Sequence, residues 1–324
     1  MSLLDGLKNF LFPRAYAFER IERPPAVVLA AFGTTHPEAL TALENVEARV
    51  RAAFPDYETR LAFTSNQVRA RWRARGADPG YRKKWPKVHP RYYEINNVLS
   101  ELASLQEAGG RPILVQSVLV ADGEEFRDLF NLIEGLKNLA TRQRSLHPFP
   151  WIGLGPPALG LGHGDEAALA RAARALSPVG ERAASGEATV ALMAHGHERL
   201  ELKVFKALEA VAKGLYGPNF HIGLVEGQPD FSRIKAAVEA TAPPGGRLLL
   251  APLMVVAGDH AKNDLAGEEG GWASEFKRMG YNVEVSLAGL GSNDQWADLY
   301  VESLRRVKEE VFKAKAEEDG LSVA

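Results

Sequence analysis

The chain alternates between continuous apolar runs and segments whose apolar residues recur every three or four positions. Runs such as 26–32 are typical of strands covered on both faces, and the segments between them are typical of amphipathic helices. The predicted strands are 26–32, 57–63, 113–120, 149–154, 188–194, 219–225, 247–255 and 281–287. The predicted helices are 37–53, 65–75, 92–108, 124–140, 164–176, 199–214, 230–241, 271–279 and 293–316. This alternation predicts parallel sheets with helical crossovers.

One strand-loop unit occurs twice along the chain. Residues 114–126 and 249–261 are each an apolar strand that runs into a glycine followed by an acidic residue. The position after that acid is Glu125 in the first copy and His260 in the second. The repeat places a carboxylate and an imidazole at equivalent strand ends, and therefore predicts a site between two half-molecules.

A second repeated unit precedes the first one in each half. Residues 27–33 match residues 190–196, so that Phe32 corresponds to His195. The two repeats are offset by 135 and 163 residues, so the first half carries about 28 extra residues around 66–92. At Phe32 the first half would offer an apolar surface where the second half supplies an imidazole.

The duplicated pattern predicts an α/β protein of two Rossmann-like halves, each a four-stranded parallel sheet flanked by helices. A connection rich in glycine and proline at 155–164 marks the boundary between them. We expect an N-terminal accessory helix segment at 1–24, α/β domains at 25–160 and 161–291, and a C-terminal helix within 292–324. In such folds ligands bind beyond the carboxyl ends of the strands.

Composition and charge narrow the classes of function. Of the 324 residues, 46% are hydrophobic and 25% are charged, as in a soluble globular protein. A formal net charge of −2 gives no electrostatic reason to expect nucleic acid or an anionic membrane as partner. The absence of cysteine excludes disulfides, thiolate metal sites and cysteine nucleophiles.

The N-terminal segment is apolar at helical spacing but lacks the basic start and cleavage site of a signal peptide. No apolar run approaches the roughly 20 residues that span a bilayer. We therefore expect a cytoplasmic protein, with the periplasm left open. Residues 3–12 are interpreted as a short helix that packs on the body or on a neighbouring subunit.

Phe32, Glu125, His195 and His260 all fall just beyond predicted strands. Two imidazoles and a carboxylate form a nitrogen and oxygen ligand set that suits Co²⁺, Fe²⁺, Ni²⁺ or Zn²⁺. These residues lie far apart in sequence, so an ordinary strand-end histidine bonded to a backbone carbonyl is the alternative. The duplication favours the metal site, because it brings all three ligands to equivalent strand ends facing one cleft.

The roles of other polar residues near these ligands are left open by the sequence. His197 follows His195 across a glycine that favours a turn, so its side chain either joins the site or points away. Acidic residues crowd both loops, and we expect most of them to complement helix N-termini rather than to relay cations. They are Asp122, Glu124, Glu125, Asp128, Asp259, Asp264, Glu268 and Glu269.

The extra segment 66–91 is strongly basic. It carries nine lysines and arginines against one acid, Asp78, with Trp72, Tyr81 and Trp85 interleaved. It fits either a patch for a polyanionic ligand or a solvated helix-loop flap. A nucleic-acid patch has no support in the remainder of the chain.

Short motifs recur in a fixed order from about residue 26 to residue 315. They are Ala31-Phe-Gly-Thr-Thr35, Ala62-Phe-Thr-Ser65, Gln116-Ser117, Gly123-Glu-Glu-Phe126, Met193-Ala-His-Gly196, Val225-Glu226 with Pro229, Pro252-Leu-Met-Val-Val-Ala-Gly-Asp-His-Ala-Lys-Asn-Asp264, Trp272 and Gly289-Leu-Gly291. Together they resemble the anaerobic sirohydrochlorin cobaltochelatases, relatives of ferrochelatase.

The resemblance implies a chelatase fold whose last helix packs back on the first half. It implies ATP-independent insertion of Co²⁺ into the tetrapyrrole sirohydrochlorin, in anaerobic cobalamin biosynthesis. The family's metal ligands fall on His195, Glu125 and His260, which would hold Co²⁺ as substrate and bound metal, with Fe²⁺ or Ni²⁺ able to replace it in vitro. His195 is the candidate proton acceptor. The eight carboxylates of sirohydrochlorin need cationic partners, for which Arg69, Arg71 and Lys83–Lys84 are candidates.

Two positions depart from the family pattern. His36 stands where relatives often have tyrosine, and Leu119 stands where they often have histidine. We expect contacts to the substrate or to the metal ligands from His36, Phe32, Glu124 and Asp264.

Two alternatives to cobalt insertion stay open at this stage. One is iron insertion towards sirohaem, and the other is a tetrapyrrole or metal carrier without turnover. Sirohydrochlorin is the expected partner, with neither nucleic acid nor membrane, and a homo-oligomer stays compatible with the sequence.

Overall fold

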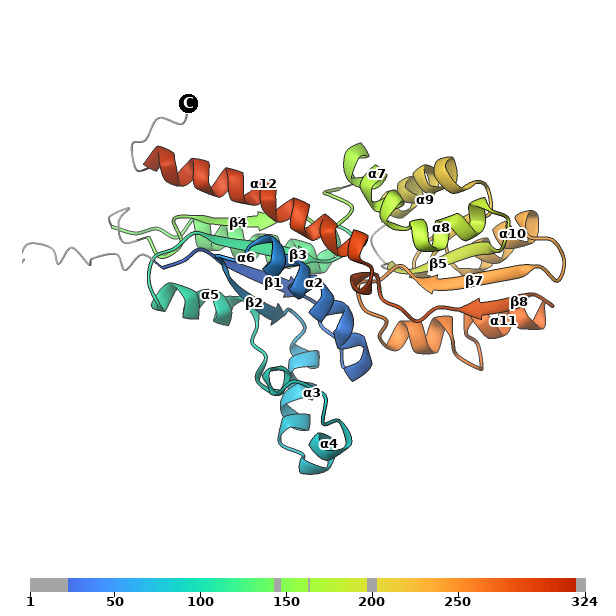
Figure 1. The fold of residues 1–324 in the computed structure, drawn as a ribbon, viewed down its shortest axis with the longest axis horizontal. Coiled ribbons are helices and arrows are strands. Elements are labelled where there is room, and N and C mark those ends of the chain that lie inside the picture. Colours follow the sequence, from blue (N-terminus) through green and yellow to red (C-terminus); the bar gives the residue numbers. More distant parts are fainter. Residues whose placement is uncertain (1–22, 143–146, 163, 197–202, 319–324) are drawn as a thin grey trace, which may run out of the picture.

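The computed structural model describes residues 23–142, 147–162, 164–196 and 203–318. Two four-stranded parallel sheets, each flanked by helices, form two halves that lie side by side (Figure 1). The predicted α/β fold of two Rossmann-like halves is confirmed. The helix expected at 3–12 lies outside the described residues. Within the described part of the chain, no helix combines the length and the apolarity needed to cross a membrane.

The first half is built on a sheet with strand order β2-β1-β3-β4. Its strands are β1 (Ala26–Ala31), β2 (Glu58–Phe63), β3 (Ile113–Val118) and β4 (Ile152–Gly155). Its helices are η1 (Pro37–Ala39), α2 (Leu40–Ala53), α3 (Asn66–Gly76), α4 (Pro79–Lys84), η2 (Pro90–Glu94), α5 (Val98–Glu107) and α6 (Glu124–Lys137). Successive residues of a strand point to opposite faces, so Val27 and Leu29 pack towards α2 while Val28 and Ala30 pack towards α5 and α6.

The second half repeats this arrangement with strand order β6-β5-β7-β8. Its strands are β5 (Thr189–Gly196), β6 (Phe220–Glu226), β7 (Arg247–Pro252) and β8 (Asn282–Val285). Its helices are α7 (Glu166–Ala175), α8 (Ser177–Ala184), α9 (Lys203–Tyr216), α10 (Phe231–Thr241), the π-helical turn η4 (Ala261–Leu265) and α11 (Trp272–Arg278). The shared strand order makes β1 equivalent to β5 and β3 equivalent to β7, as the two sequence repeats predict.

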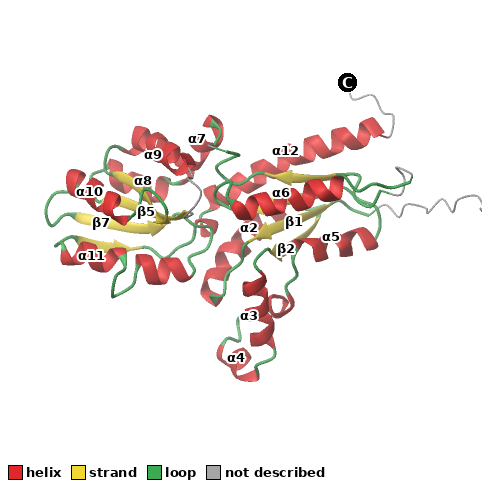
Figure 2. Cartoon of the chain, turned by 180° about the vertical axis from the view of Figure 1, so that it is seen from behind, coloured by secondary structure: helices red, strands yellow, loops and turns green. Residues whose placement is uncertain are grey.

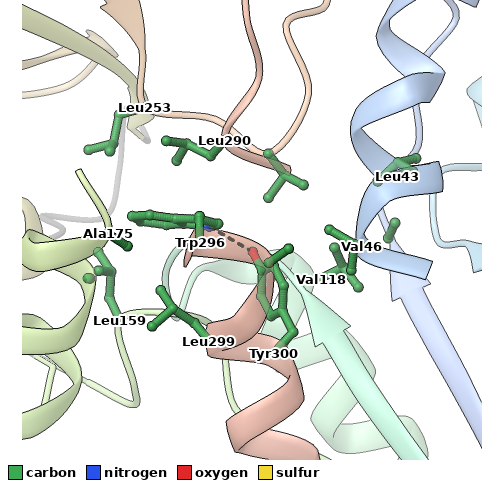
Figure 3. Packing of buried hydrophobic residues seen from close by; sticks show 14 of the residues in the cluster. Leu43, Val46, Val118, Leu159, Ala175, Leu253, Leu290, Trp296, Leu299 and Tyr300 are labelled. Carbon is green, nitrogen blue, oxygen red and sulfur yellow. Dashed lines mark hydrogen bonds between the residues drawn. The ribbon is translucent and has the colours of Figure 1, made fainter. Parts of the chain in front are cut away.

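The last helix, α12 (Asp294–Glu318), follows η5 (Leu290–Ser292) and returns from the second half to the first. It packs along β3, β4 and α2 (Figures 1 and 2). Trp296, near its start, is buried among Leu159 and Leu253 on one side and Val118 on the other (Figure 3). Because this apolar cluster takes side chains from both halves, it fixes their relative position at the junction between them (Figure 1).

The boundaries of several elements differ from the predictions. The segment expected as one helix over 92–108 is the short 3-10 helix η2 followed by α5, because Ile95 is extended and Asn97 caps α5 by accepting from the Ser100 backbone N–H. The strands expected at 113–120 and 247–255 end at Val118 and Pro252. Helices α4 and α8 were not predicted, since their residues lack the apolar spacing of the longer helices. The domain limits at 24, 160 and 291 stay predictions.

The extra residues of the first half form a projection that we call the arm, residues 66–94. It consists of α3, α4 and η2 and extends away from both sheets (Figures 1 and 2). Trp72 is fully buried at its base and contacts Tyr81, Tyr92 and Tyr93. An aromatic group at the base of the arm therefore continues the main hydrophobic core.

Candidate functional site

The carboxyl ends of both sheets face a cavity of about 330 Å³. Its walls are the segments that follow β1, β3 and β7, together with the end of β5. This is the place where open α/β sheets bind ligands. The cavity therefore lies between the two halves, as the duplication predicts.

His195 reaches the cavity from the end of β5 because the next residue bends the strand. Gly196 has φ +79°, and a Cβ atom at this position would lie 1.8 Å from the backbone oxygen of Glu226 on β6. Only glycine allows both this conformation and this close approach. His195 is exposed, and its Nδ1 lies 3.1 Å from the Gly196 carbonyl oxygen. A carbonyl can only accept, so Nδ1 carries the proton and Nε2 keeps its lone pair.

His260 comes from the segment after β7 and directly precedes η4. Its Nδ1 lies 2.7 Å from Oδ2 of Asp264, one turn further along the chain. A carboxylate accepts at this position, which again leaves Nε2 with a lone pair. The His195 and His260 rings lie 4.6 Å apart, centroid to centroid, with an angle of 89° between their planes. The structure thus brings together the two histidines that the sequence singled out.

Glu125 lines the same cavity from the first turn of α6, next to Glu124. Among the described residues, however, no three His, Asp or Glu side chains gather as a metal-binding group. Glu125 is thus a wall residue of the cavity rather than part of a three-ligand cluster with the histidines. His197 and Glu198 lie outside the described residues.

The remaining wall of the cavity is mostly apolar. Phe32, at the position equivalent to His195, lines it and is 45% exposed. The apolar lining residues are Ala31, Phe32, Leu43, Val68, Val118, Leu119, Val120, Ala121, Phe205, Met254, Val255 and Val256. Leu119 is one of the departures from the family pattern. Such a surface suits the face of a flat, largely apolar ring.

A chain of polar contacts joins the two halves at this cavity. His36, which follows β1, contacts Asp259 through Nε2 at 2.7 Å. The Lys262 ammonium lies 3.0 Å from Nδ1 of the same ring and also pairs with Glu38. Burial alone raises the pKa of the Glu38 carboxyl, but the hydrogen bond from Lys262 and the positive charge beside it outweigh burial and lower that pKa. Glu38 is therefore held as a carboxylate.

The loop that carries His36 is supported by the base of the arm. The Trp72 indole N–H donates to the Thr34 carbonyl at 2.7 Å, and Arg75 donates to the Thr35 carbonyl. The Arg75 guanidinium also lies 5.0 Å from the Trp72 ring centroid and 4.8 Å from that of Tyr81. The wall at 33–36 is thus fixed by residues inserted into the first half only.

Arg69, one of the cations suggested for the macrocycle carboxylates, is used inside the protein. It is buried and donates to the carbonyl oxygens of Phe63 and Thr64. Arg71, Lys83 and Lys84 are exposed on the arm. Arg69 therefore has no accessible charge with which to bind a ligand, whereas the charges of the other three candidates are accessible.

Sequence reasoning overlooked Lys262 although it lies inside the most specific motif. Its partners His36 and Glu38 are more than 220 positions away. The only available signal was the repeat itself, which brings the segments after β1 and β7 to one cavity.

Comparisons with known proteins agree with this architecture. The family described as "Cobalt chelatase (CbiK)" matches residues 25–309. The sirohydrochlorin cobaltochelatase of Salmonella typhimurium (strain LT2) is 26% identical over 285 residues, which cover 87% of this chain and 95% of that protein. Sirohydrochlorin cobaltochelatase CbiKC of Nitratidesulfovibrio vulgaris (strain Hildenborough) is 28% identical over 279 residues, covering 86% and 88%.

Among solved structures, SirB from Bacillus subtilis with Fe³⁺ is similar with a TM-score of 0.57. The similarity covers 93% of this chain and 100% of that one, at 12% sequence identity, and it bears on the fold alone. The family match spans both halves, the cavity between them and most of α12. The chain therefore belongs to the cobalt chelatase (CbiK) family.

Proposed function

We propose that this protein inserts Co²⁺ into sirohydrochlorin, without ATP, as a step of anaerobic cobalamin biosynthesis. Membership of the cobalt chelatase family supports the reaction, and two relatives named sirohydrochlorin cobaltochelatases support the substrate. Independence from ATP fits a sequence without a phosphate-binding loop.

The paired imidazoles of His195 and His260 carry this proposal. With each Nδ1 engaged by an acceptor, the two Nε2 lone pairs are free to bind a divalent ion. Two protein ligands leave coordination positions open for the pyrrole nitrogens, whereas a closed set of four would retain the ion. Glu125, which α6 of the first half contributes to the same cavity, would help to strip water from the incoming ion. This arrangement suits an ion that is handed on as substrate.

Insertion also requires the loss of two protons, because the metal replaces two pyrrole N–H hydrogens. Imidazole accepts and releases protons near neutral pH. Once the ion has moved into the ring, Nε2 of His195 is free to take one of these protons, and Nε2 of His260, freed in the same step, is available for the other. The apolar wall around Phe32 would meanwhile hold the ring face and keep water from it.

The test is an anaerobic insertion assay in which purified protein, sirohydrochlorin and Co²⁺ are followed by the absorbance change of the macrocycle. We expect His195→Ala and His260→Ala each to lower kcat by at least about 100-fold, as for loss of a ligand or of a general base. His147→Ala is the matched control, since His147 precedes β4 and so lies towards the amino ends of the strands, away from the cavity at their carboxyl ends. Near-normal rates in both cavity variants would refute these roles.

The same assay separates the two alternative functions. Absorbance change that stops after one equivalent of macrocycle per protein would indicate a carrier. Higher kcat/KM with Fe²⁺ than with Co²⁺ would indicate a ferrochelatase. Ligand type alone does not separate these two ions, so the comparison has to be kinetic.

A further inference from the structure

The cavity presents an electrostatic mismatch with its proposed substrate. Its described lining residues include three carboxylates, Glu124, Glu125 and Asp259, and neither lysine nor arginine. Sirohydrochlorin carries eight carboxylates. An anion of that kind needs cationic partners at the edge of the cavity, because unpaired carboxylates near other carboxylates repel.

Among the described residues, Lys262 is a cation that borders the cavity. Its Nζ lies 3.0 Å from Nδ1 of His36, a residue that lines the cavity. An ammonium group can only donate, so Nδ1 of His36 accepts from it and Nε2–H donates to Asp259. The chain of contacts from Asp259 through His36 therefore orients the ammonium group of Lys262.

A carboxylate already occupies the position next to this ammonium group. Glu38 pairs with Lys262 and lies across the junction between the halves, on η1. The Glu38 side chain is 48% exposed and that of Lys262 is 35% exposed, so neither is fixed by packing. Half-exposed ion pairs of this kind contribute about 1 kcal/mol or less, and an incoming carboxylate can replace one partner.

The size of the cavity indicates that the macrocycle extends beyond it. Its volume of about 330 Å³ lies at the lower end of the roughly 300–1,000 Å³ that holds drug-sized ligands. A tetrapyrrole with eight acidic arms is larger than such ligands, so its periphery must extend to the groups that border the cavity. The contacts between His36, Lys262 and Glu38 lie on that border.

We propose that Lys262 binds a peripheral carboxylate of the macrocycle, that His36 orients its ammonium group, and that Glu38 occupies the substrate's position until the macrocycle arrives. The inference rests on the proposed function for the identity of the macrocycle. It assigns a binding role to Lys262 and a positioning role to His36, and it makes Glu38 a competitor of the substrate.

The experiment measures the Kd of metal-free sirohydrochlorin by absorbance titration, alongside kcat and KM for Co²⁺ insertion. We expect Lys262→Ala to raise the Kd and KM about fivefold, with a smaller change in kcat, and Lys262→Arg to retain most of the affinity. Glu38→Gln should lower the Kd about threefold, because it removes the competing charge. Lys137→Ala is the matched control, since Lys137 is similarly exposed (37%) and similarly paired, with Glu134, at the far end of α6.

The Kd is expected to rise in Lys262→Ala and to fall in Glu38→Gln, and these opposite changes distinguish a binding role from a purely structural one. If the contacts only brace the two halves, Lys262→Ala and Glu38→Gln should both lower the thermal midpoint and neither should tighten macrocycle binding. That result, or an unchanged Kd in Lys262→Ala, would overturn the proposal. Wild-type turnover with Co²⁺ tests the proposed function separately, because the metal-free Kd does not depend on insertion.

Discussion

His221 on β6 offers a sharp test of the electrostatics of the fold. Its side chain is 2% exposed, and Nε2 lies 2.8 Å from Thr241 Oγ1. The Thr241 hydroxyl donates to the Ala237 carbonyl, so it accepts from His221, and the ring is neutral with its proton on Nε2. Burial, and secondarily the positive charge of Lys213, lowers the pKa of His221 to about 4. Glu209 lies 4.0 Å from Nδ1 but is already paired with Lys213.

The consequence for stability follows from proton linkage. In the unfolded chain a histidine titrates near 6.5, so between about pH 6.5 and 4 the unfolded state binds more protons than the folded state. Stability is therefore full above pH 6.5 and falls as the pH is lowered towards 4. Each pH unit between the two pKa values costs about 1.4 kcal/mol of stability, so His221 accounts for a loss of about 3 kcal/mol in the free energy of unfolding.

The measurement is the free energy of unfolding from urea titrations between pH 7.5 and 4.5, followed by circular dichroism. Replacement His221→Gln keeps a donor for Thr241 and removes the titrating group. We expect the variant to lose about 2–3 kcal/mol less than wild type over this range. Equal losses in wild type and His221→Gln would refute the assignment of a neutral buried imidazole.

Two further predictions concern the metal ligands and their support. Asp264→Ala should weaken Co²⁺ binding, measured by calorimetry without macrocycle, by about 10- to 100-fold, because the Nδ1 proton of His260 loses its acceptor; an unchanged affinity would contradict this orientation. Gly196→Ala should lower both the thermal midpoint and insertion activity, because its Cβ would meet the Glu226 backbone. Gly186→Ala, at a similar φ of +73° but with open space around it, isolates the cost of the positive φ, about 1–2 kcal/mol; equal effects of both variants would refute the clash.

The sheets could be predicted from the sequence because their signals are local. Val27, Leu29 and their neighbours form unbroken apolar runs, and the repeated units fix which strands are equivalent. The histidines could be predicted because each falls in a repeated unit just beyond a strand, His195 at the position of Phe32 and His260 at the position of Glu125. Their position at one cavity follows from parallel strand order alone.

Other features could not be predicted because they depend on contacts between distant segments. Tyr92 and Tyr93 have the spacing of a helix, yet they pack against Trp72 in the arm, and the helix begins only at Val98. In the sequence Lys262 does not differ from other charged residues, and only the fold brings His36 beside it. For Glu125, the repeat predicts a metal ligand but does not give its distance from the two histidines.

The support of the cavity wall by the arm has a consequence for how this protein can vary in evolution. Trp72 and Arg75 hold the carbonyls of Thr34 and Thr35, so substitutions there should alter the cavity although they lie in an insertion. Residues 82–84, at the tip of the arm, are exposed and have no such role in supporting the wall. Natural variants should therefore tolerate changes of length and charge at the tip of the arm but conserve the residues at its base. The insertion thus consists of two regions under different selection.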